Sequence, residues 1–88
     1  MKTVHLPADY ALVLQQIEEN GEDDFVNLAE SLRIERSRMS HILESLQHKG
    51  LIRISRAAHG TWIRLSTRGR RLAQTLWPES GPQAAFSM

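Results

Sequence analysis

The sequence predicts a small, mainly α-helical domain with one β-hairpin, an α+β fold. Apolar residues recur with helical period in four segments, and after Gly50 the period changes to two, as in a β-strand. Charge is also divided along the chain. Residues 1–35 hold eight acids against two bases, net −6, whereas residues 36–88 hold nine bases against two acids, net +7. A basic half of this kind is expected of a surface that meets phosphates.

The composition is that of one globular domain. The chain has 88 residues, 41% of them hydrophobic and 24% charged, which is enough for a modest buried core. The absence of cysteine excludes a disulfide scaffold, Cys-based zinc sites and thiol catalysis. No apolar run approaches the ~20 residues of a membrane span, and the first residues lack the apolar stretch of a signal peptide. We therefore expect a chain without membrane contact, in the cytoplasm and associated with the nucleoid.

The first helix is expected to follow Pro7, which suits a first helical turn because its missing N–H needs no partner there. Gly21 should end this helix in a left-handed conformation. The acids of residues 22–24 should then form a turn just before the next helix. The apolar stripe of this first helix is Tyr10, Val13, Leu14 and Ile17.

A short second helix follows, and Arg33-Ile34-Glu35 should break it. Asp24 or Asn27 could cap its start, and Asn27 with Glu30 has the spacing of a capping box. Alternatively, Phe25-Val26 could be a very short strand. The residues expected to face inward are Phe25, Leu28, Ala29 and Leu32.

The third helix is expected over about residues 35–49, with Gly50 at its end. Its buried stripe is Met39, Ile42, Leu43 and Leu46. Arg36 and Arg38 flank its first turn, where the helix dipole disfavours an exposed cation by about 0.3–1 kcal/mol. We therefore interpret both as contacts to phosphate or bases rather than as solvated charges. The outer face holds Ser37, Ser40, His41, Glu44, Ser45 and His48.

Residues 51–66 should form a hairpin with one apolar face and a basic tip, turning at Ala58-His59-Gly60. Trp62 faces away from the apolar side and could pack on the hairpin, contact nucleic acid or cover a partner. Thr67 should cap a fourth helix whose inward residues are Leu72, Ala73, Leu76 and Trp77. We expect residues 1–77 to form the domain and residues 78–88 a flexible tail.

Two short helices joined by a three- or four-residue turn, followed by a hairpin, are typical of a winged helix-turn-helix. The second helix of the pair fits a major groove, and its first turn presents N–H groups and a dipole to phosphate. The hairpin, or wing, would bring Arg56, His59 and Arg64 toward a flanking backbone or minor groove. Eight of the nine bases in residues 36–88 are arginine, which can fork onto phosphate or a guanine edge.

The chain resembles the winged helix-turn-helix core of MarR-type transcriptional regulators over roughly residues 10–76. The residues that carry the resemblance are Leu28-Ala29, Leu32, Ile34, Met39-Ser40, Leu43, Leu46, Gly50-Leu51-Ile52-Arg53 and Ile63-Arg64-Leu65-Ser66-Thr67-Arg68-Gly69. The resemblance implies that Ser37, Arg38, Ser40 and His41 occupy positions that often touch bases or phosphates. The chain departs from the family at the wing tip, where Ala57-Ala58-His59-Gly60 replaces an acidic-x-Arg pattern. It also lacks the long flanking helices through which that family usually dimerises.

We therefore predict a winged helix-turn-helix regulator of transcription that binds double-stranded DNA sequence-specifically. The expected DNA contacts are Arg36, Ser37, Arg38, Ser40, His41 and Ser45 on the recognition helix, and Arg56, His59, Gly60 and Arg64 on the wing. A homodimer is expected because one recognition helix reads only a few base pairs. The apolar surface available for it is Tyr10, Leu12, Leu76 and Trp77. The alternative is a winged-helix protein-interaction module, with the acidic half or Trp62 as its contact surface.

The sequence holds no motif for catalysis or for a cofactor. No Ser, His and Asp have the spacing of a nucleophile with its base, and there is no phosphate-cradling glycine loop or carboxylate pair. His41 and His48 share a helix face but lie two turns apart, too far for a metal pair. We therefore expect no enzyme activity, cofactor or metal, and no small-molecule effector is indicated. Binding to RNA is disfavoured because the deep major groove of an A-form helix excludes an α-helix.

Overall fold

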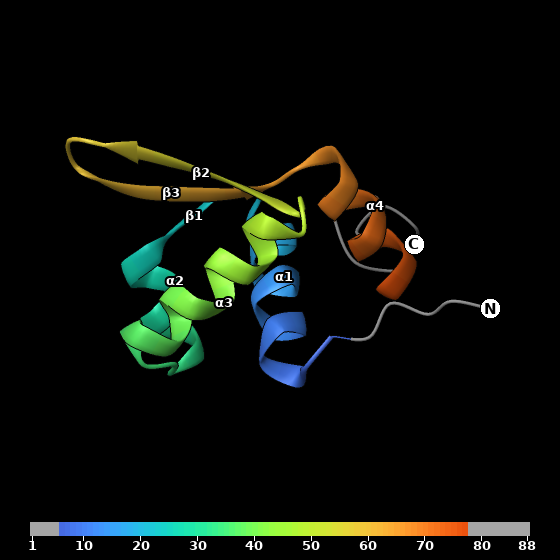
Figure 1. Ribbon diagram of the computed structural model, residues 1–88, viewed down its shortest axis with the longest axis horizontal. Helices are drawn as coiled ribbons and strands as arrows, with labels where there is room; N and C mark the ends of the chain where they lie inside the picture. Colours follow the sequence, from blue (N-terminus) through green and yellow to red (C-terminus); the bar gives the residue numbers. More distant parts are fainter. Residues whose placement is uncertain (1–5, 78–88) are drawn as a thin grey trace, which may run out of the picture.

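The computed structural model describes residues 6–77, which form four helices and a three-stranded antiparallel sheet (Figure 1). The predicted α+β class and the winged helix-turn-helix order are confirmed. The expected tail, residues 78–88, lies outside the described residues. The elements are α1 (Ala8–Asn20), β1 (Asp23–Asp24), α2 (Phe25–Leu32), α3 (Arg36–His48), β2 (Ile52–Ala57), β3 (Gly60–Leu65) and α4 (Thr67–Leu76).

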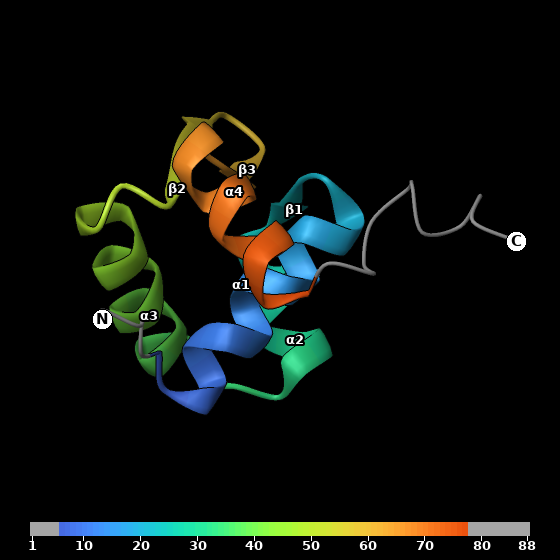
Figure 2. The same cartoon turned by 90° about the vertical axis from the view of Figure 1, so that its right-hand side faces the viewer.

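The core lies between the sheet and helices α1, α2 and α3, which sit together on one side of the hairpin (Figure 1). Helix α4 lies beside α1, at the end away from the wing tip (Figure 2). The predicted stripes of α1 and α3 are buried in full. Each fully buried Leu, Ile or Val contributes about 1.5–3 kcal/mol of transfer free energy. None of the helices among residues 6–77 is long and apolar enough to span a membrane.

The acidic segment after α1 is a strand rather than a free turn. Asp23 lies opposite Ile63 and Asp24 opposite Trp62, so β1 extends the sheet to the order β1-β3-β2. The alternative prediction of a strand at Phe25-Val26 is wrong, because the strand ends at Asp24 and Phe25 begins α2.

Asp23 is a buried carboxylate with a full set of hydrogen-bond donors. It is 5% exposed, and its oxygens accept from Asn20 Nδ2 at 2.8 Å, Asn27 Nδ2 at 2.7 Å and the Asp24 N–H at 2.9 Å. A buried carboxylate is tolerated only when it is paired or hydrogen-bonded in this way. Asp23 therefore joins the end of α1, strand β1 and the first turn of α2.

Of the two caps predicted for α2, the structure confirms Asp24, whose Oδ1 accepts from the Asn27 N–H at 2.8 Å, and not Asn27. The start of α4 differs from the prediction by one residue. Ser66 rather than Thr67 caps α4, its Oγ accepting from the Gly69 N–H at 3.0 Å and donating to the Gly50 carbonyl at 2.6 Å. The additional bond to Gly50 ties the start of α4 to the end of α3.

The turn between α2 and α3 has the predicted position. Arg33 ends α2 in the left-handed conformation, with φ 57°, and the Ile34 N–H donates to the Ala29 carbonyl at 2.9 Å. A non-glycine residue rarely adopts this conformation, which costs about 1–2 kcal/mol. Helix α3 then spans Arg36–His48, one residue shorter at each end than predicted.

The register of the wing divides its residues between two faces. Ile52 lies opposite Leu65 and Ile54 opposite Ile63, on the face turned to the core. Arg53 lies opposite Arg64, and Ser55 opposite Trp62, on the other face. The two faces follow because successive side chains of a strand point to opposite sides. Ala57 pairs with Gly60, so the turn between the strands is Ala58–His59.

Helix α4 meets the core through a glycine. Gly69 is buried, and a Cβ at that position would overlap the carbonyl oxygen of Leu51. Ala73 is also buried, whereas Leu72 and Trp77 are half-buried against the core. The prediction that Leu76 faces inward is wrong, since it is 39% exposed. The helix ends there, and the following Trp77 packs against the core instead.

Candidate nucleic-acid interface

Helix α3 presents a polar, exposed face opposite its buried stripe. Residues three and four apart on a helix are neighbours, so this face is one continuous strip along the helix. Its exposed members are Arg36, Ser37, Arg38, Ser40, His41, Glu44, Gln47 and His48. All but one of the predicted recognition-helix residues therefore lie on an accessible surface.

Ser45 is the exception. It is half-buried, and its Oγ accepts a hydrogen bond from the Tyr10 hydroxyl at 3.2 Å. The prediction that Ser45 lies on the outer face is wrong, because its position on the helix turns it toward α1. Its hydrogen bond holds α1 against the recognition helix.

The two arginines at the start of α3 have different surroundings. Arg38 donates to Asp9 Oδ2 of helix α1 through Nη2 at 2.7 Å and Nε at 2.9 Å, and its guanidinium lies 5.6 Å from the centre of the Tyr10 ring. The hydrogen bond from Arg38 holds the pKa of Asp9 below its ordinary value of 3.8. Arg36 forms no ion pair within residues 6–77. The negative charge of Asp9 thus offsets the unfavourable interaction between the Arg38 cation and the dipole at the start of α3.

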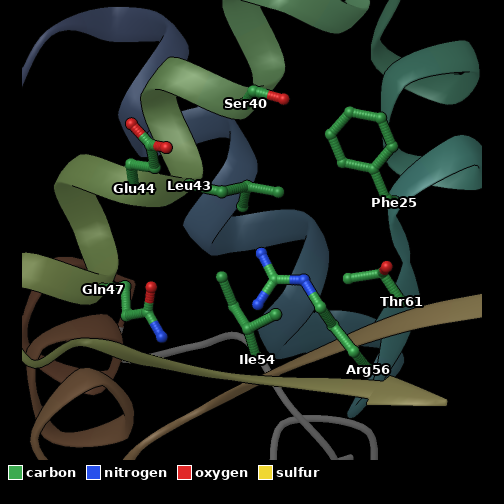
Figure 3. A pocket seen from close by; sticks show the side chains of 8 residues that line it. All are labelled: Phe25, Ser40, Leu43, Glu44, Gln47, Ile54, Arg56 and Thr61. Carbon is green, nitrogen blue, oxygen red and sulfur yellow. The ribbon is translucent and has the colours of Figure 1, made fainter.

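Arg56 lies on the core-side face of the wing and points toward α3 (Figure 3). There it lines an open cavity of about 280 Å³ between the wing, the start of α2 and the recognition helix. The other lining residues are Phe25, Ser40, Leu43, Glu44, Gln47, Ile54 and Thr61. The structure therefore brings Arg56 and Ser40, two predicted site residues, to one cavity.

His59 and Gly60 lie at the wing tip. His59 is exposed in the two-residue turn, and Gly60 begins β3 with φ 151°. A Cβ at Gly60 would meet only the indole nitrogen of Trp62, at 3.7 Å. The tip is thus a small, exposed end of the hairpin, which suits a narrow groove.

Arg64 does not share a surface with Arg56. It lies on the outer face of the sheet, opposite Arg53 and beside the half-buried Trp62. A pocket of about 330 Å³ is lined there by Glu22, Arg53, Ile54, Ser55, Trp62 and Arg64. The predicted wing arginines are therefore on opposite faces of the hairpin.

Two acids belong to this surface although neither was among the predicted contacts. Glu44 lies in the middle of the exposed strip of α3, where its helical position could have identified it. Asp9 is separated from Arg38 by 29 positions, and no local pattern links the two. No group of three or more metal-ligating side chains lies close enough together to hold a metal among the described residues.

Solved structures resemble this fold, whereas no protein-family model and no curated protein matches the chain. A MarR family transcriptional regulator of Silicibacter pomeroyi is 28% identical with a TM-score of 0.75, covering 84% of this chain and 54% of that one. MarR of E. coli is 19% identical with a TM-score of 0.77, covering 91% and 62%. BpsR of Bordetella bronchiseptica, whose DNA binding is regulated by 6-hydroxynicotinic acid, is 21% identical with a TM-score of 0.75, covering 83% and 54%.

The chain thus spans little more than half the length of the structures that it matches. The predicted resemblance is confirmed at the level of the fold.

Proposed function

Because the chain has the winged helix-turn-helix fold of MarR-type transcriptional regulators, we propose that it binds double-stranded DNA sequence-specifically and regulates transcription. The observation that carries the proposal is the exposed strip of α3, which is polar and basic at its first turn and lies on the side opposite the buried stripe. A helix of this width fits the major groove. The regulator of Bordetella bronchiseptica with the same fold binds DNA, which supports the assignment.

In this proposal the recognition helix reads bases and the wing fixes its position. Arg36 would fork onto a guanine or a phosphate, and Ser37, Ser40 and His41 would contact bases or backbone beside it. Glu44 would accept a hydrogen bond from a cytosine amino group. The first N–H groups of α3 would face a phosphate, as helix N-termini do.

The wing would contribute through its tip and through Arg56. His59 and Gly60 would approach a flanking backbone or minor groove, and Arg56 would reach a phosphate at the edge of the cavity that it shares with α3. Arg64 would meet only a backbone that passes the outer face of the sheet. We assign the chain no catalytic role, and such a protein would act on chromosomal DNA in the cytoplasm. Residues 1–77 would form the DNA-binding domain and residues 78–88 its tail.

Titration of a duplex across a range of salt concentrations tests the proposal. Each neutralised phosphate contributes a log–log slope of about −0.9, so four to eight contacts predict a slope of about −4 to −7. Arg36→Ala should weaken binding at least about tenfold, which is about 1.4 kcal/mol, since one bidentate contact is worth ~1–3 kcal/mol. His59→Ala should cost less, because a wing-tip contact meets backbone rather than bases.

The matched control is Arg71→Ala, which removes the same charge from the exposed surface of α4, away from the recognition helix. Circular dichroism establishes that each variant is folded. Binding that does not depend on salt, or equal losses for Arg36→Ala and Arg71→Ala, would contradict the assignment of α3 as the recognition helix.

We also propose that the protein binds as a homodimer. Two recognition helices about 34 Å apart on a palindrome would supply the base pairs that one helix cannot. Tyr10, predicted as part of the contact surface, is buried at 8% exposure and is unsuitable, whereas Leu12 is 49% and Leu76 39% exposed. Sedimentation at tens of micromolar should show a species of twice the 10.0 kDa chain mass. A 10.0 kDa species alone, with and without duplex, would refute the dimer.

The outer face of the wing supports a second candidate function, a protein-interaction module without DNA binding. Trp62 is half-buried there, opposite Ser55, and lines one pocket together with Arg53 and Arg64. Helices α1, α2 and α3 lie on the other side of the hairpin (Figure 1). Trp and Arg are the residues enriched at the energetic centres of protein interfaces. The salt titration separates the two candidates, since an interaction module has no need of the basic start of α3.

A further inference from the structure

The ion pair between helix α1 and the recognition helix bears directly on DNA affinity. We infer that Asp9 accepts the hydrogen bonds that Arg38 would otherwise donate to a DNA phosphate. By this competition, helix α1 lowers the affinity of the recognition helix for DNA. The inference rests on the proposed function and adds an affinity-setting residue outside the recognition helix.

Asp9 is held in a defined position at the start of α1. Its Oδ1 accepts from the Tyr10 N–H at 3.0 Å, while its Oδ2 accepts from Arg38 at 2.7 and 2.9 Å. Tyr10 in turn places its ring beneath the Arg38 guanidinium and donates its hydroxyl to Ser45. The pair is therefore part of the packing between α1 and α3.

A carboxylate and a phosphate bind an arginine through the same N–H groups. Both accept forked, charge-assisted hydrogen bonds from the guanidinium N–H groups, and Asp9 already takes those of Nε and Nη2. The side chains of Arg38 and Asp9 are 46% and 31% exposed, so a phosphate can approach the pair. Asp9 thus holds the place that a backbone phosphate would take.

The charge balance leads to the same conclusion. While Asp9 is paired with Arg38, the two side chains together carry no net charge. Arg38 then neutralises no DNA phosphate, and no counterion is released from the DNA at that position. The Asp9 carboxylate also repels a phosphate that contacts the remaining N–H groups of Arg38. Arg36, in the same helical turn, has no ion pair among the described residues and keeps its full charge for DNA. Arg38 should therefore contribute less to binding than Arg36, although both lie in the first turn of α3.

A double-mutant cycle between Asp9→Asn and Arg38→Ala tests the inference in the full chain. Asparagine keeps the shape of Asp9 and removes its charge. In the parent background we expect Asp9→Asn to tighten duplex binding up to about fivefold, the range that breaking an exposed ion pair allows. The salt slope should become steeper by about 0.9, because Arg38 then neutralises one more phosphate. In the Arg38→Ala background the same substitution should leave the slope unchanged.

Glu35→Gln is the matched control. Glu35 is an exposed acid at the N-cap of α3 and makes no side-chain hydrogen bond there. Its neutralisation removes the same charge from the same end of the recognition helix without releasing an arginine. We expect any gain from Glu35→Gln to be equal in the parent and Arg38→Ala backgrounds. Thermal melts of every variant, with Asp9→Ser as a second replacement, establish that folding is unaffected.

Weaker binding by Asp9→Asn would show that Asp9 instead positions Arg38 for DNA, and would overturn the inference. Equal gains in affinity from Asp9→Asn in the parent and Arg38→Ala backgrounds would show that Asp9 acts only by general repulsion of DNA. That result would also overturn the inference. A parent chain that binds duplex, with no change on Asp9→Asn, would refute the inference alone. A chain that binds no duplex at low salt, in either form, would refute the proposed function together with it.

Discussion

Replacing Gly69 with alanine should lower the melting temperature by about 8–16 °C, even though alanine is the better helix former. Alanine in a helix interior gains about 0.5–1 kcal/mol over glycine. At Gly69, however, the new Cβ would overlap the Leu51 carbonyl oxygen and lie 2.9 Å from its carbon. Overpacking costs about 1–3 kcal/mol and sometimes more, and here the obstacle is backbone, which cannot rotate away. We expect a net loss of about 2 kcal/mol, at about 4–8 °C per kcal/mol for a domain of this size.

The strain would spread to the base of the wing, because the Leu51 carbonyl also accepts the Ser66 N–H at 3.0 Å. Gln74→Ala, on the exposed side of the same helix, serves as the control and should change stability by less than about 0.5 kcal/mol. A Gly69→Ala chain that melts at or above the parent temperature would show that α4 does not approach Leu51 so closely.

Leu43→Ala should reduce the free energy of unfolding by about 2–5 kcal/mol. Leu43 is 3% exposed in the middle of the buried stripe of α3, so the substitution removes apolar burial and leaves a void. That loss is a large part of the ~5–15 kcal/mol of a typical domain. Ser40→Ala, three residues earlier and exposed, should cost less than about 0.5 kcal/mol. Urea denaturation of the two variants measures the difference, and equal midpoints would mean that the helical phase of α3 is wrong.

Helix α3 shows what the sequence can predict. Met39, Ile42, Leu43 and Leu46 recur at helical spacing, and that spacing alone determines which side is buried. The same reasoning placed the hairpin, since Ile52, Ile54, Ile63 and Leu65 alternate with polar residues. Local period is a strong signal because burial of one face is what stabilises an amphipathic element.

Strand β1 shows where local patterns fail. Asp23 and Asp24 are typical of turns, and their strand partners lie some 40 positions later. The burial of Asp23 depends on Asn20 and Asn27, whose geometry exists only once α1 and α2 are packed. The Asp9–Arg38 pair is equally non-local. The placement of Arg56 and Arg64 on opposite faces of the wing is different, because it can be predicted from the sequence. Arg56 is in phase with the apolar residues of its strand, whereas Arg64 alternates with those of the next.

The buried carboxylate of Asp23 has a consequence for how the domain opens. It joins the end of α1 to α2, and through β1 to β3, the central strand of the sheet. Its donors come from α1, β1 and α2 and not from the wing, so separation of β3 from β1 would leave these hydrogen bonds in place. Loosening of α1 from α2, by contrast, would remove the Asn20 or Asn27 donor and leave a buried carboxylate underpaired, which is costly.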